Sequence, residues 1–293
     1  MKLGFITPYT EERVKFAAKA GFECLEVVAE KGSALDLDII SEKKLQDIME
    51  VFQNNGIEFA TIQCAPNHLE GDKVKRKENN DYFKKAIKMC RKFGTDIVMT
   101  NAWANRDISP VENLKVYKEV FSEFAKVAED EGVRITIENC PHWVGYPTPV
   151  GNISYSPEIW DAMFELVPSK AIGLEFDPSH LCWLGIDYIK VIKEYGDRIY
   201  ACHAKDTEIM KDKLDKYGII GKQIGKSSEW DAGWWRYRIP GWGMVDWLGI
   251  FRALNDIGFN GTMVIEHEDP VFEGERFDEG LKLGLRYLKQ FVL

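Results

Sequence analysis

The chain has 293 residues, of which 45% are hydrophobic and 29% are charged. This length suits one (β/α)8 barrel, which needs about 250 residues, and the composition is typical of a folded protein with a sizeable core. There are 38 Lys and Arg against 47 Asp and Glu, which gives a net charge of −9. The surplus of negative charge argues against a nucleic-acid partner, because such proteins neutralise phosphates with Lys and Arg.

No segment reaches 18 consecutive apolar residues, so we expect neither a transmembrane helix nor a membrane partner. The first residues lack the apolar core of a signal peptide and indicate a strand instead. Six cysteines lie scattered along the chain without a Cys-x-x-Cys pair, as in proteins of a reducing compartment. We therefore expect a cytoplasmic protein with a single domain over residues 1–293.

Short apolar runs alternate with amphipathic segments from end to end, which predicts strands alternating with helices. The predicted strands are 2–6, 23–28, 58–63, 96–100, 134–138, 171–176, 199–203 and 262–266. The predicted helices are 11–19, 42–54, 79–93, 111–131, 156–166, 186–195, 245–257 and 276–290. Eight strand–helix units predict an α/β protein with the (β/α)8 TIM-barrel fold. An open doubly wound sheet is less favoured, because no Gly-x-Gly-x-x-Gly follows the first strand.

Two connections are longer than a barrel requires, and both follow carboxyl ends of strands, where barrel enzymes place their sites. One covers 141–156, and the other is an aromatic-rich insertion at about 207–243. Aromatic rings suit the apolar face of a sugar, although they also pack lids and oligomer interfaces. Tryptophans on this face are Trp103, Trp143, Trp183, Trp230, Trp234, Trp235 and Trp242. No glycine-rich phosphate loop is present, so we favour a neutral sugar over a sugar phosphate.

The last four strands each end in a carboxylate or an imidazole. These residues are Glu138, Asp177, His203 and Glu266. Four such groups at one barrel mouth would include mutually repelling carboxylates, which a shared divalent cation would neutralise. Three oxygen donors and one imidazole suit Mn²⁺, Mg²⁺, Co²⁺ or Zn²⁺.

The sequence resembles the xylose isomerase-like TIM barrels, the family of sugar phosphate isomerases and epimerases related to ketose 3-epimerases and endonuclease IV. The resemblance covers essentially the whole chain. It rests on the segments AGFECLEV, ITIENCP, GLEFDPSHL, HAKDTE, RIPGWGMVDW and VIEHEDP.

The resemblance implies a metal bound by Glu138, Asp177, His203 and Glu266, with Mn²⁺ favoured. It also implies that Glu138 and Glu266 form an acid/base pair on opposite sides of the substrate carbon. Such a site would act on a carbohydrate through a metal-stabilised enediolate, and so predicts an isomerase or epimerase.

Three other functions stay open. A metal-dependent lyase or dehydratase on a keto-sugar, an inosose or a 3-keto-glycoside would use the same ligands. A metal-binding or interaction protein without catalysis is another possibility. An endonuclease IV-like DNA-repair enzyme is disfavoured, because the chain has only five histidines and Asn101 stands where that group carries another.

Further residues near the strand ends are candidates for substrate binding. They are His180, His142, His68, Lys205, Arg238 and Trp103. Each has a structural alternative: His180 would orient a ligand, Lys205 would form a salt bridge within the barrel mouth, and Arg238 would pair with Asp206. Glu26 and Glu175 are candidates for tuning the metal ligands from one layer deeper. We also expect that the barrel forms a homo-oligomer if its aromatic loops pair.

Overall fold

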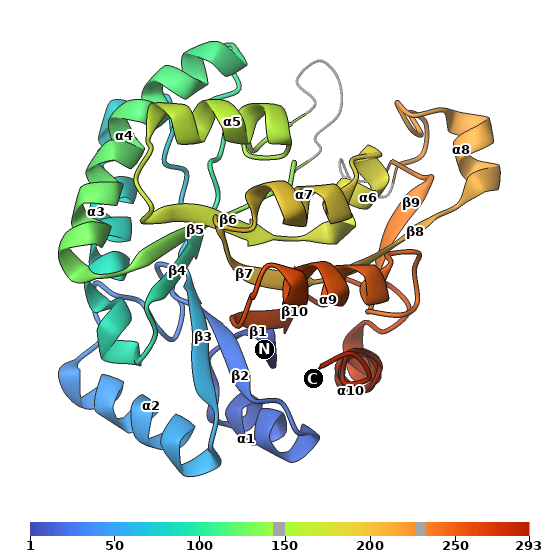
Figure 1. Ribbon diagram of the computed structural model, residues 1–293. Helices are drawn as coiled ribbons and strands as arrows, with labels where there is room; N and C mark the ends of the chain where they lie inside the picture. The colour runs from blue at the N-terminus through green and yellow to red at the C-terminus, as the bar shows by residue number, and fades with distance from the viewer. Residues whose placement is uncertain (143–149, 227–231, 293) are drawn as a thin grey trace.

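The computed structural model describes residues 1–142, 150–226 and 232–292. Its centre is a closed barrel of eight parallel strands in the order β1-β10-β7-β6-β5-β4-β3-β2 (Figure 1). The strands are β1 (Lys2–Pro8), β2 (Cys24–Val28), β3 (Glu58–Gln63), β4 (Ile97–Thr100), β5 (Arg134–Glu138), β6 (Ile172–Phe176), β7 (Ile199–Ala204) and β10 (Thr262–Ile265). The predicted (β/α)8 barrel is therefore confirmed.

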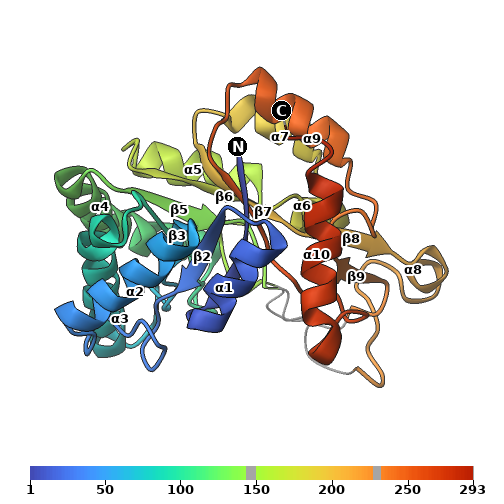
Figure 2. The ribbon, with the colours of Figure 1, turned by 90° about the horizontal axis from the view of Figure 1, so that it is seen from below.

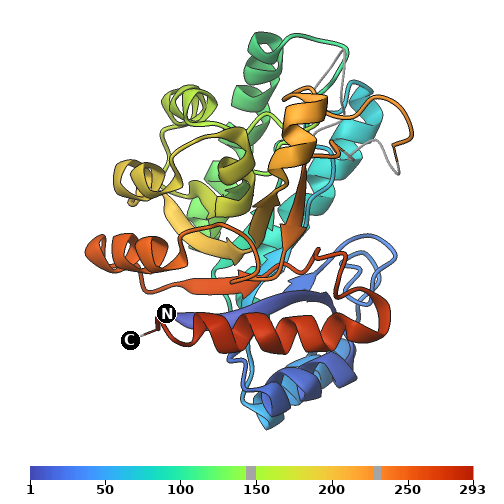
Figure 3. The ribbon, with the colours of Figure 1, turned by 90° about the vertical axis from the view of Figure 1, so that its right-hand side faces the viewer.

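Helices surround the barrel on its outside, as the views from below and from the side show (Figures 2 and 3). They are α1 (Glu11–Ala20), α2 (Glu42–Asn55), α3 (Lys73–Met89), α4 (Pro110–Glu131), α5 (Pro157–Leu166), α6 (Pro178–Leu184), α7 (Tyr188–Tyr195), α9 (Trp247–Asp256) and α10 (Phe277–Leu288), with 3-10 turns η1 (Cys90–Phe93) and η2 (Gly274–Arg276). Helix α4 shows how the sequence sets such boundaries. Ser109 and Glu112 form a capping box at its start, and Gly132 ends it with a φ of 62°.

Two predicted helices differ from the observed ones. Helix α3 begins at Lys73, six residues before the predicted start, because the Asp72 side chain accepts hydrogen bonds from the backbone N–H groups of Val74 and Lys75. The segment predicted as one helix over 186–195 is preceded by a short additional helix, α6. Its signal is the Asp-Pro pair, a capping residue followed by a proline at the first helical position.

The aromatic-rich insertion contains secondary structure of its own. Strands β8 (Asp206–Ile209) and β9 (Trp235–Arg238) pair antiparallel, and helix α8 (Lys211–Tyr217) follows β8. This unit projects from the barrel beside β7 (Figure 1). Trp183 of α6 stacks on Trp235 with ring centroids 4.6 Å apart, so the aromatic residues anchor the hairpin to the barrel. Trp143 and Trp230 lie outside the described residues.

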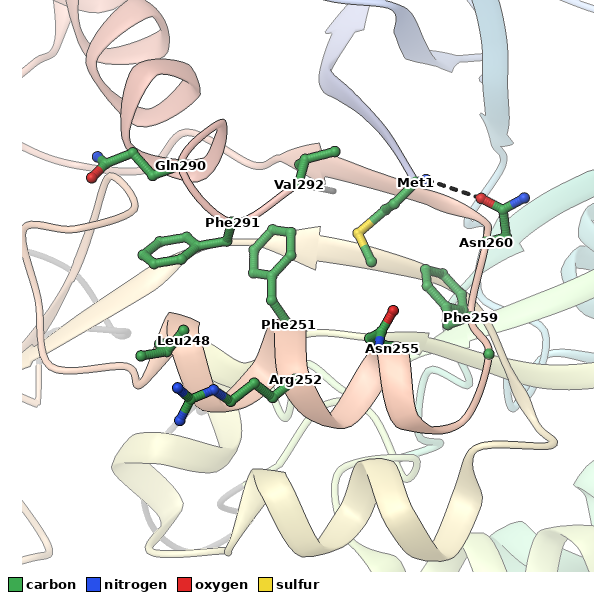
Figure 4. Close-up of a pocket in the computed structure, with 11 residues that line it drawn as sticks. Met1, Leu248, Phe251, Arg252, Asn255, Phe259, Asn260, Gln290, Phe291 and Val292 are labelled. Carbon is green, nitrogen blue, oxygen red and sulfur yellow. Dashed lines mark hydrogen bonds between the residues drawn. The ribbon is translucent and has the colours of Figure 1, made fainter.

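The two ends of the chain lie close together, where β1 pairs with β10 (Figures 1 and 3). The amino group of Met1 donates a hydrogen bond to Oδ1 of Asn260 at 3.0 Å (Figure 4). An apolar groove of about 560 Å³ lies here, lined by Phe251, Phe259 and Phe291 among others. The lining contains no carboxylate, imidazole or thiol, and it lies at the amino ends of the strands. No helix among the described residues is long and apolar enough to span a bilayer.

Candidate active site

Four side chains from the carboxyl ends of neighbouring strands meet at one point. They are Glu138 of β5, Asp177 after β6, His203 of β7 and Glu266 after β10. One donor atom of each lies within 4.8 Å of the donor atoms of the other three. Asp177 and His203 are fully buried and Glu138 is 4% exposed, whereas 20% of the Glu266 side chain is exposed. Glu266 is therefore the most accessible of the four.

Asp177 is positioned by the start of helix α6. Its Oδ1 caps the helix by accepting a hydrogen bond from the backbone N–H of Ser179 at 2.8 Å. The side chain of Asn139 donates to the Asp177 carbonyl and accepts from the Asp177 N–H, each at 2.8 Å. With the backbone and Oδ1 fixed in this way, Oδ2 faces the site.

His203 lies between the two glutamates. Its Nδ1 is 3.2 Å from Oε1 of Glu138 and 3.1 Å from Oε2 of Glu266. Burial lowers the pKa of His203, but the charges of Glu26 and Glu266 outweigh this and raise the pKa well above its usual value. For Glu138, burial raises the pKa, yet the nearby imidazole of His180 and the hydrogen bond with His203 hold it well below its usual value. Glu138 is therefore an ionised carboxylate at neutral pH.

Lys205 is a buried cation among three carboxylates. Its Nζ donates to Oε2 of Glu266 at 2.6 Å and to Glu268 at 3.0 Å, and lies 3.3 Å from Oδ2 of Asp177. Burial lowers the pKa of Lys205, but the charges of Glu266 and Glu268 raise it well above its usual value. The salt bridge in the barrel mouth, one of two roles predicted for Lys205, is therefore present.

His180 lies in contact with two of the four donors. Its Nε2 is 3.3 Å from Oδ2 of Asp177 and 3.6 Å from Oε1 of Glu138. Its Nδ1 is 2.8 Å from the hydroxyl of Tyr237, which belongs to β9. The insertion therefore contributes to the site through Tyr237, which contacts His180 of α6.

Two buried carboxylates lie on the other side of the His203 ring. Nε2 of His203 is 3.4 Å from Oε1 of Glu26 and 3.7 Å from Oε1 of Glu175. Thr61 and Thr136 donate to the other oxygens of Glu26 and Glu175, at 2.7 and 2.6 Å. Burial, together with the charge of Glu26, raises the pKa of Glu175 to about 8. Glu26 orients the ring by accepting its Nε2–H, and Glu175 lies beside it, which leaves Nδ1 directed at the site.

The four converging residues fit a divalent cation. Three carboxylates and one imidazole are a donor set that such ions take in proteins. Oδ2 of Asp177 is buried and accepts no hydrogen bond, although Lys205 and His180 lie 3.3 Å away. A buried carboxylate oxygen without a donor is costly, and a cation at the meeting point would satisfy it.

His142 and Trp103 form the edge of the site next to Glu138. Their rings stack with centroids 4.0 Å apart, and Nε1 of Trp103 donates to the carbonyl of Ala65 at 2.8 Å. A ring nitrogen of His142 lies within 4.8 Å of a Glu138 oxygen. The structure thus brings both predicted substrate-binding residues to the site.

His68 is a structural residue of the core, and its prediction as a substrate contact needs correction. Nδ1 lies 3.0 Å from Oδ1 of Asn80, and Nε2 lies 2.7 Å from the hydroxyl of Thr100. The ring is fully buried against Phe83 and Phe124. Burial lowers its pKa to about 4, so it is neutral. Both ring nitrogens are already used, which leaves none for a substrate.

We expect His68→Ala to lower the free energy of unfolding by about 2–4 kcal/mol, because it leaves a cavity and two polar groups without their partner. Urea denaturation measures this. His68→Gln, which keeps part of the hydrogen bonding, should cost less. Metal content should not change in either variant. A loss of substrate affinity with unchanged stability would contradict the structural role.

Arg238 is also used inside the protein. Its guanidinium donates to Asp269 at 2.9 Å and to Glu208 at 2.7 Å, and the residue is buried. The predicted ion pair between Arg238 and Asp206 is wrong, although the two residues are neighbours across the β8–β9 pair. The Asp206 carboxylate instead accepts hydrogen bonds from the backbone N–H groups of Gly241 and Val245. Arg238 therefore stabilises the insertion, and its prediction as a substrate contact is corrected accordingly.

Three residues near the site were not predicted as site residues. Nδ2 of Asn101, directly after β4, donates to Oε2 of Glu138 at 3.1 Å. Tyr237 contacts His180, and Glu268 contacts Lys205. Asn101 and Glu268 had a usable signal, because one directly follows a strand and the other alternates with Glu266. Tyr237 had none, because the hairpin that carries it was not predicted.

The chain matches a known family over most of its length. A family model described as "Xylose isomerase-like TIM barrel" matches residues 14–291. The chain belongs to this family. Within the xylose isomerase-like family, it is 26% identical to an inosose isomerase of Bacillus velezensis over 84% of this chain and 79% of that protein. It is also 26% identical to an inosose dehydratase of Clostridium perfringens over 54% of this chain and 49% of that protein.

Solved structures share the fold over nearly the whole chain. D-psicose 3-epimerase from Clostridium cellulolyticum H10, solved with D-tagatose, has a TM-score of 0.71 with 18% identity, and 99% of each chain is covered. The IolI protein, solved with a zinc atom, has a TM-score of 0.69 with 22% identity, covering 99% of this chain and 96% of that one. At these identities the likeness concerns the fold.

Proposed function

We propose that the protein is a divalent-metal-dependent sugar isomerase or epimerase that acts through an enediolate. The observation that carries the proposal is the convergence of Glu138, Asp177, His203 and Glu266 at the barrel mouth. The relatives support a small carbohydrate substrate, since their names describe an inosose isomerase, an inosose dehydratase and a ketose epimerase.

The metal would be held by the same four residues. We expect Mn²⁺ first, with Mg²⁺, Co²⁺ and Zn²⁺ as alternatives; zinc is the ion in the IolI structure. When bound, such a cation would polarise a carbonyl and the adjacent hydroxyl as a Lewis acid.

Glu138 and Glu266 are the proposed acid and base. Each has an oxygen at the meeting point, and these residues approach Nδ1 of His203 to 3.2 and 3.1 Å. One carboxylate removes the proton from the carbon next to the carbonyl. If the other returns a proton to the opposite face of that carbon, an epimer forms; return to the neighbouring carbon gives an isomer. Trp103 and His142 would then lie against the substrate, and His180 and Lys205 would contact its oxygens.

A metal-dependent lyase is the second candidate. The inosose dehydratase relative supports it, and so does the hairpin β8–β9, which places Tyr237 beside His180 and could accommodate a leaving group. Both reactions begin with the same proton removal, so they differ in what leaves the enediolate afterwards.

Solvent deuterium incorporation tests the proposal and separates the two candidates. The purified protein with added Mn²⁺ is incubated in D₂O with a panel of ketoses, inososes and 3-keto-glycosides, and NMR follows each carbon. Deuterium at one carbon together with a new epimer or isomer supports the proposal. Loss of water or an aglycone supports the lyase. No exchange in any substrate of the panel, with the metal bound, would contradict both.

Lys205 gives a prediction about pH. Burial raises the pKa of Glu266, but the charge of Lys205, together with the charge and hydrogen bond of His203, lowers it below its usual value. In Lys205→Met the pKa of Glu266 should rise, so the base form is lost at higher pH. We expect the acid limb of kcat/KM to move up by about 1 pH unit or more. Lys205→Arg keeps the charge and should shift the limb less. An unchanged profile in Lys205→Met would show that Lys205 does not set this pKa.

We also propose a cytoplasmic location. All six cysteines are free thiols, which fits a reducing compartment. The small-molecule substrate is then the main partner, and a homo-oligomer remains an expectation.

A further inference from the structure

The segment after β5 places three different donor types next to one another. Glu138, Cys140 and His142 alternate along the chain, and one donor atom of each lies within 4.8 Å of those of the other two. Glu138 is also one of the four residues of the oxygen-rich site. His142 stands at the edge of that site without being one of its four donors, and the proposed reaction gives the Cys140 thiol no task.

The backbone of this segment is held firmly. The side chain of Asn152 donates to the carbonyls of Glu138 and Cys140, at 3.0 and 2.7 Å. The backbone N–H of Gly151 donates to the carbonyl of His142 at 2.9 Å. The segment between the two residues is therefore tied at both ends to the chain that returns toward α5.

His142 has an unusual backbone conformation. Its φ of 45° makes it the only non-glycine residue with a positive φ in the described part of the chain. This region is costly for a side chain other than glycine, and such strain is concentrated at functional sites. Stacking on Trp103 fixes the imidazole in the orientation that this backbone gives it. The conformation thus brings the imidazole back toward Cys140 and Glu138.

The three donor atoms are close to the geometry of a tetrahedral zinc site. With Zn–S near 2.3 Å and Zn–N and Zn–O near 2.0 Å, tetrahedral ligand atoms lie about 3.3 to 3.6 Å apart. Closing the group from within 4.8 Å needs side-chain movements of about 1 Å. Cys140 and His142 are both partly exposed, so such movements are available and an ion has a path from solvent.

We infer that Cys140, His142 and Glu138 form a second cation site, for a thiolate-preferring ion of the Zn²⁺ class, next to the oxygen-rich site. A thiolate and an imidazole select softer ions, whereas three carboxylates suit Mn²⁺ or Mg²⁺. Glu138 is shared, so an ion in the second site takes a carboxylate oxygen that the proposed proton transfer also needs. The inference goes beyond the proposed function and does not require that function to be correct.

Cobalt titration of the whole protein tests the site without an activity assay. Co²⁺ reports thiolate ligation by a charge-transfer band in the near ultraviolet, and elemental analysis gives the number of ions per chain. We expect two Co²⁺ per chain and the band in the wild type. Cys140→Ser should lose the band and one ion, and His142→Gln should weaken both. Cys182→Ser is the matched control, because Cys182 is the other partly exposed cysteine; it should keep the band and both ions.

Asp177→Asn separates this inference from the proposed function. That variant should lose the ion of the oxygen-rich site and keep the thiolate band. One Co²⁺ per chain in the wild type without the band would overturn the second site and leave the first intact. Persistence of the band in Cys140→Ser, or its loss in Cys182→Ser, would also overturn it. If the wild type shows the band but binds only one Co²⁺, and Asp177→Asn changes neither result, the oxygen-rich site is empty. That outcome would contradict the proposed function alone.

Discussion

Replacing Glu138 or Glu266 with Gln is expected to lower the rate of substrate proton exchange by about 100- to 10,000-fold. Glutamine has the same shape as glutamate and its amide oxygen can still contact a cation, but it cannot accept and release a proton at neutral pH. The nearby imidazole of His180 and the hydrogen bond with His203 keep Glu138 ionised, so this residue is prepared to act as a base. Part of the metal should remain in both variants.

The two variants should differ in a way that reveals the face each residue serves. In a two-base epimerase, the variant that lacks one carboxylate loses exchange only from the epimer whose proton points toward it. Deuterium wash-in is therefore measured separately from each of two epimers, with metal content determined in parallel. Glu273→Gln changes an exposed glutamate after β10 and is the control, with exchange expected to be normal. Full exchange in both site variants would refute the acid/base assignment.

Loss of His203 should strongly lower the metal content of the protein. The imidazole is the one nitrogen donor among the four, and Glu26 orients it through its other ring nitrogen. Loss of an outer-shell partner costs about 10- to 100-fold in metal affinity, and loss of the ligand itself should cost more. Elemental analysis after dialysis measures this in His203→Ala. His267→Gln is the control, because His267 directly follows Glu266 but stacks on Phe277 instead. Unchanged metal in His203→Ala would remove His203 from the ligand set.

The pH dependence of metal binding also tests whether His203 is a metal ligand. The carboxylates around His203 raise its pKa well above the usual value, so the ring is protonated at neutral pH when only protein groups surround it. A metal must displace that proton, and affinity should therefore rise with pH by up to about tenfold per unit below the raised pKa. Calorimetry in buffers of different ionisation enthalpy counts the proton released. His203→Gln should release one proton fewer; equal release from both proteins would contradict this assignment.

The barrel and the ends of its strands could be predicted from the sequence, because both depend on local patterns. A strand that is buried on both sides is a short apolar run, and the first polar residue after it falls on the catalytic rim. This rule placed Glu138, Asp177, His203 and Glu266 correctly at that rim. It needs no knowledge of which strands are neighbours, since all eight carboxyl ends meet on one face.

Long-range pairing is what the sequence did not reveal. The pairing of β8 with β9 spans about 25 intervening residues, and no short turn connects the two strands. Without that pairing, Tyr237 could not be assigned to His180, nor Arg238 to Asp269. His68 shows the complementary problem, because a histidine after a strand has the same sequence signal whether it faces the mouth or the aromatic core. Its hydrogen bonds to Asn80 and Thr100 decide the matter, and they come from other segments.

The position of Glu266 at the end of the last barrel strand links the supply of the metal to the stability of the protein. Strand β10 is the last barrel strand along the chain and lies between β1 and β7, and Glu266 directly follows it. An ion shared with residues of β5, β6 and β7 would hold the end of β10 to these strands, which follow it in the barrel. Binding to the folded chain alone adds RT ln(1 + [M]/Kd), about 2.7 kcal/mol when the free ion is at 100 times Kd. Scarcity of the ion would therefore lower the free energy of unfolding of the barrel. The pairing of β1 with β10, where the two chain ends lie, would open more often and expose these strands to proteases.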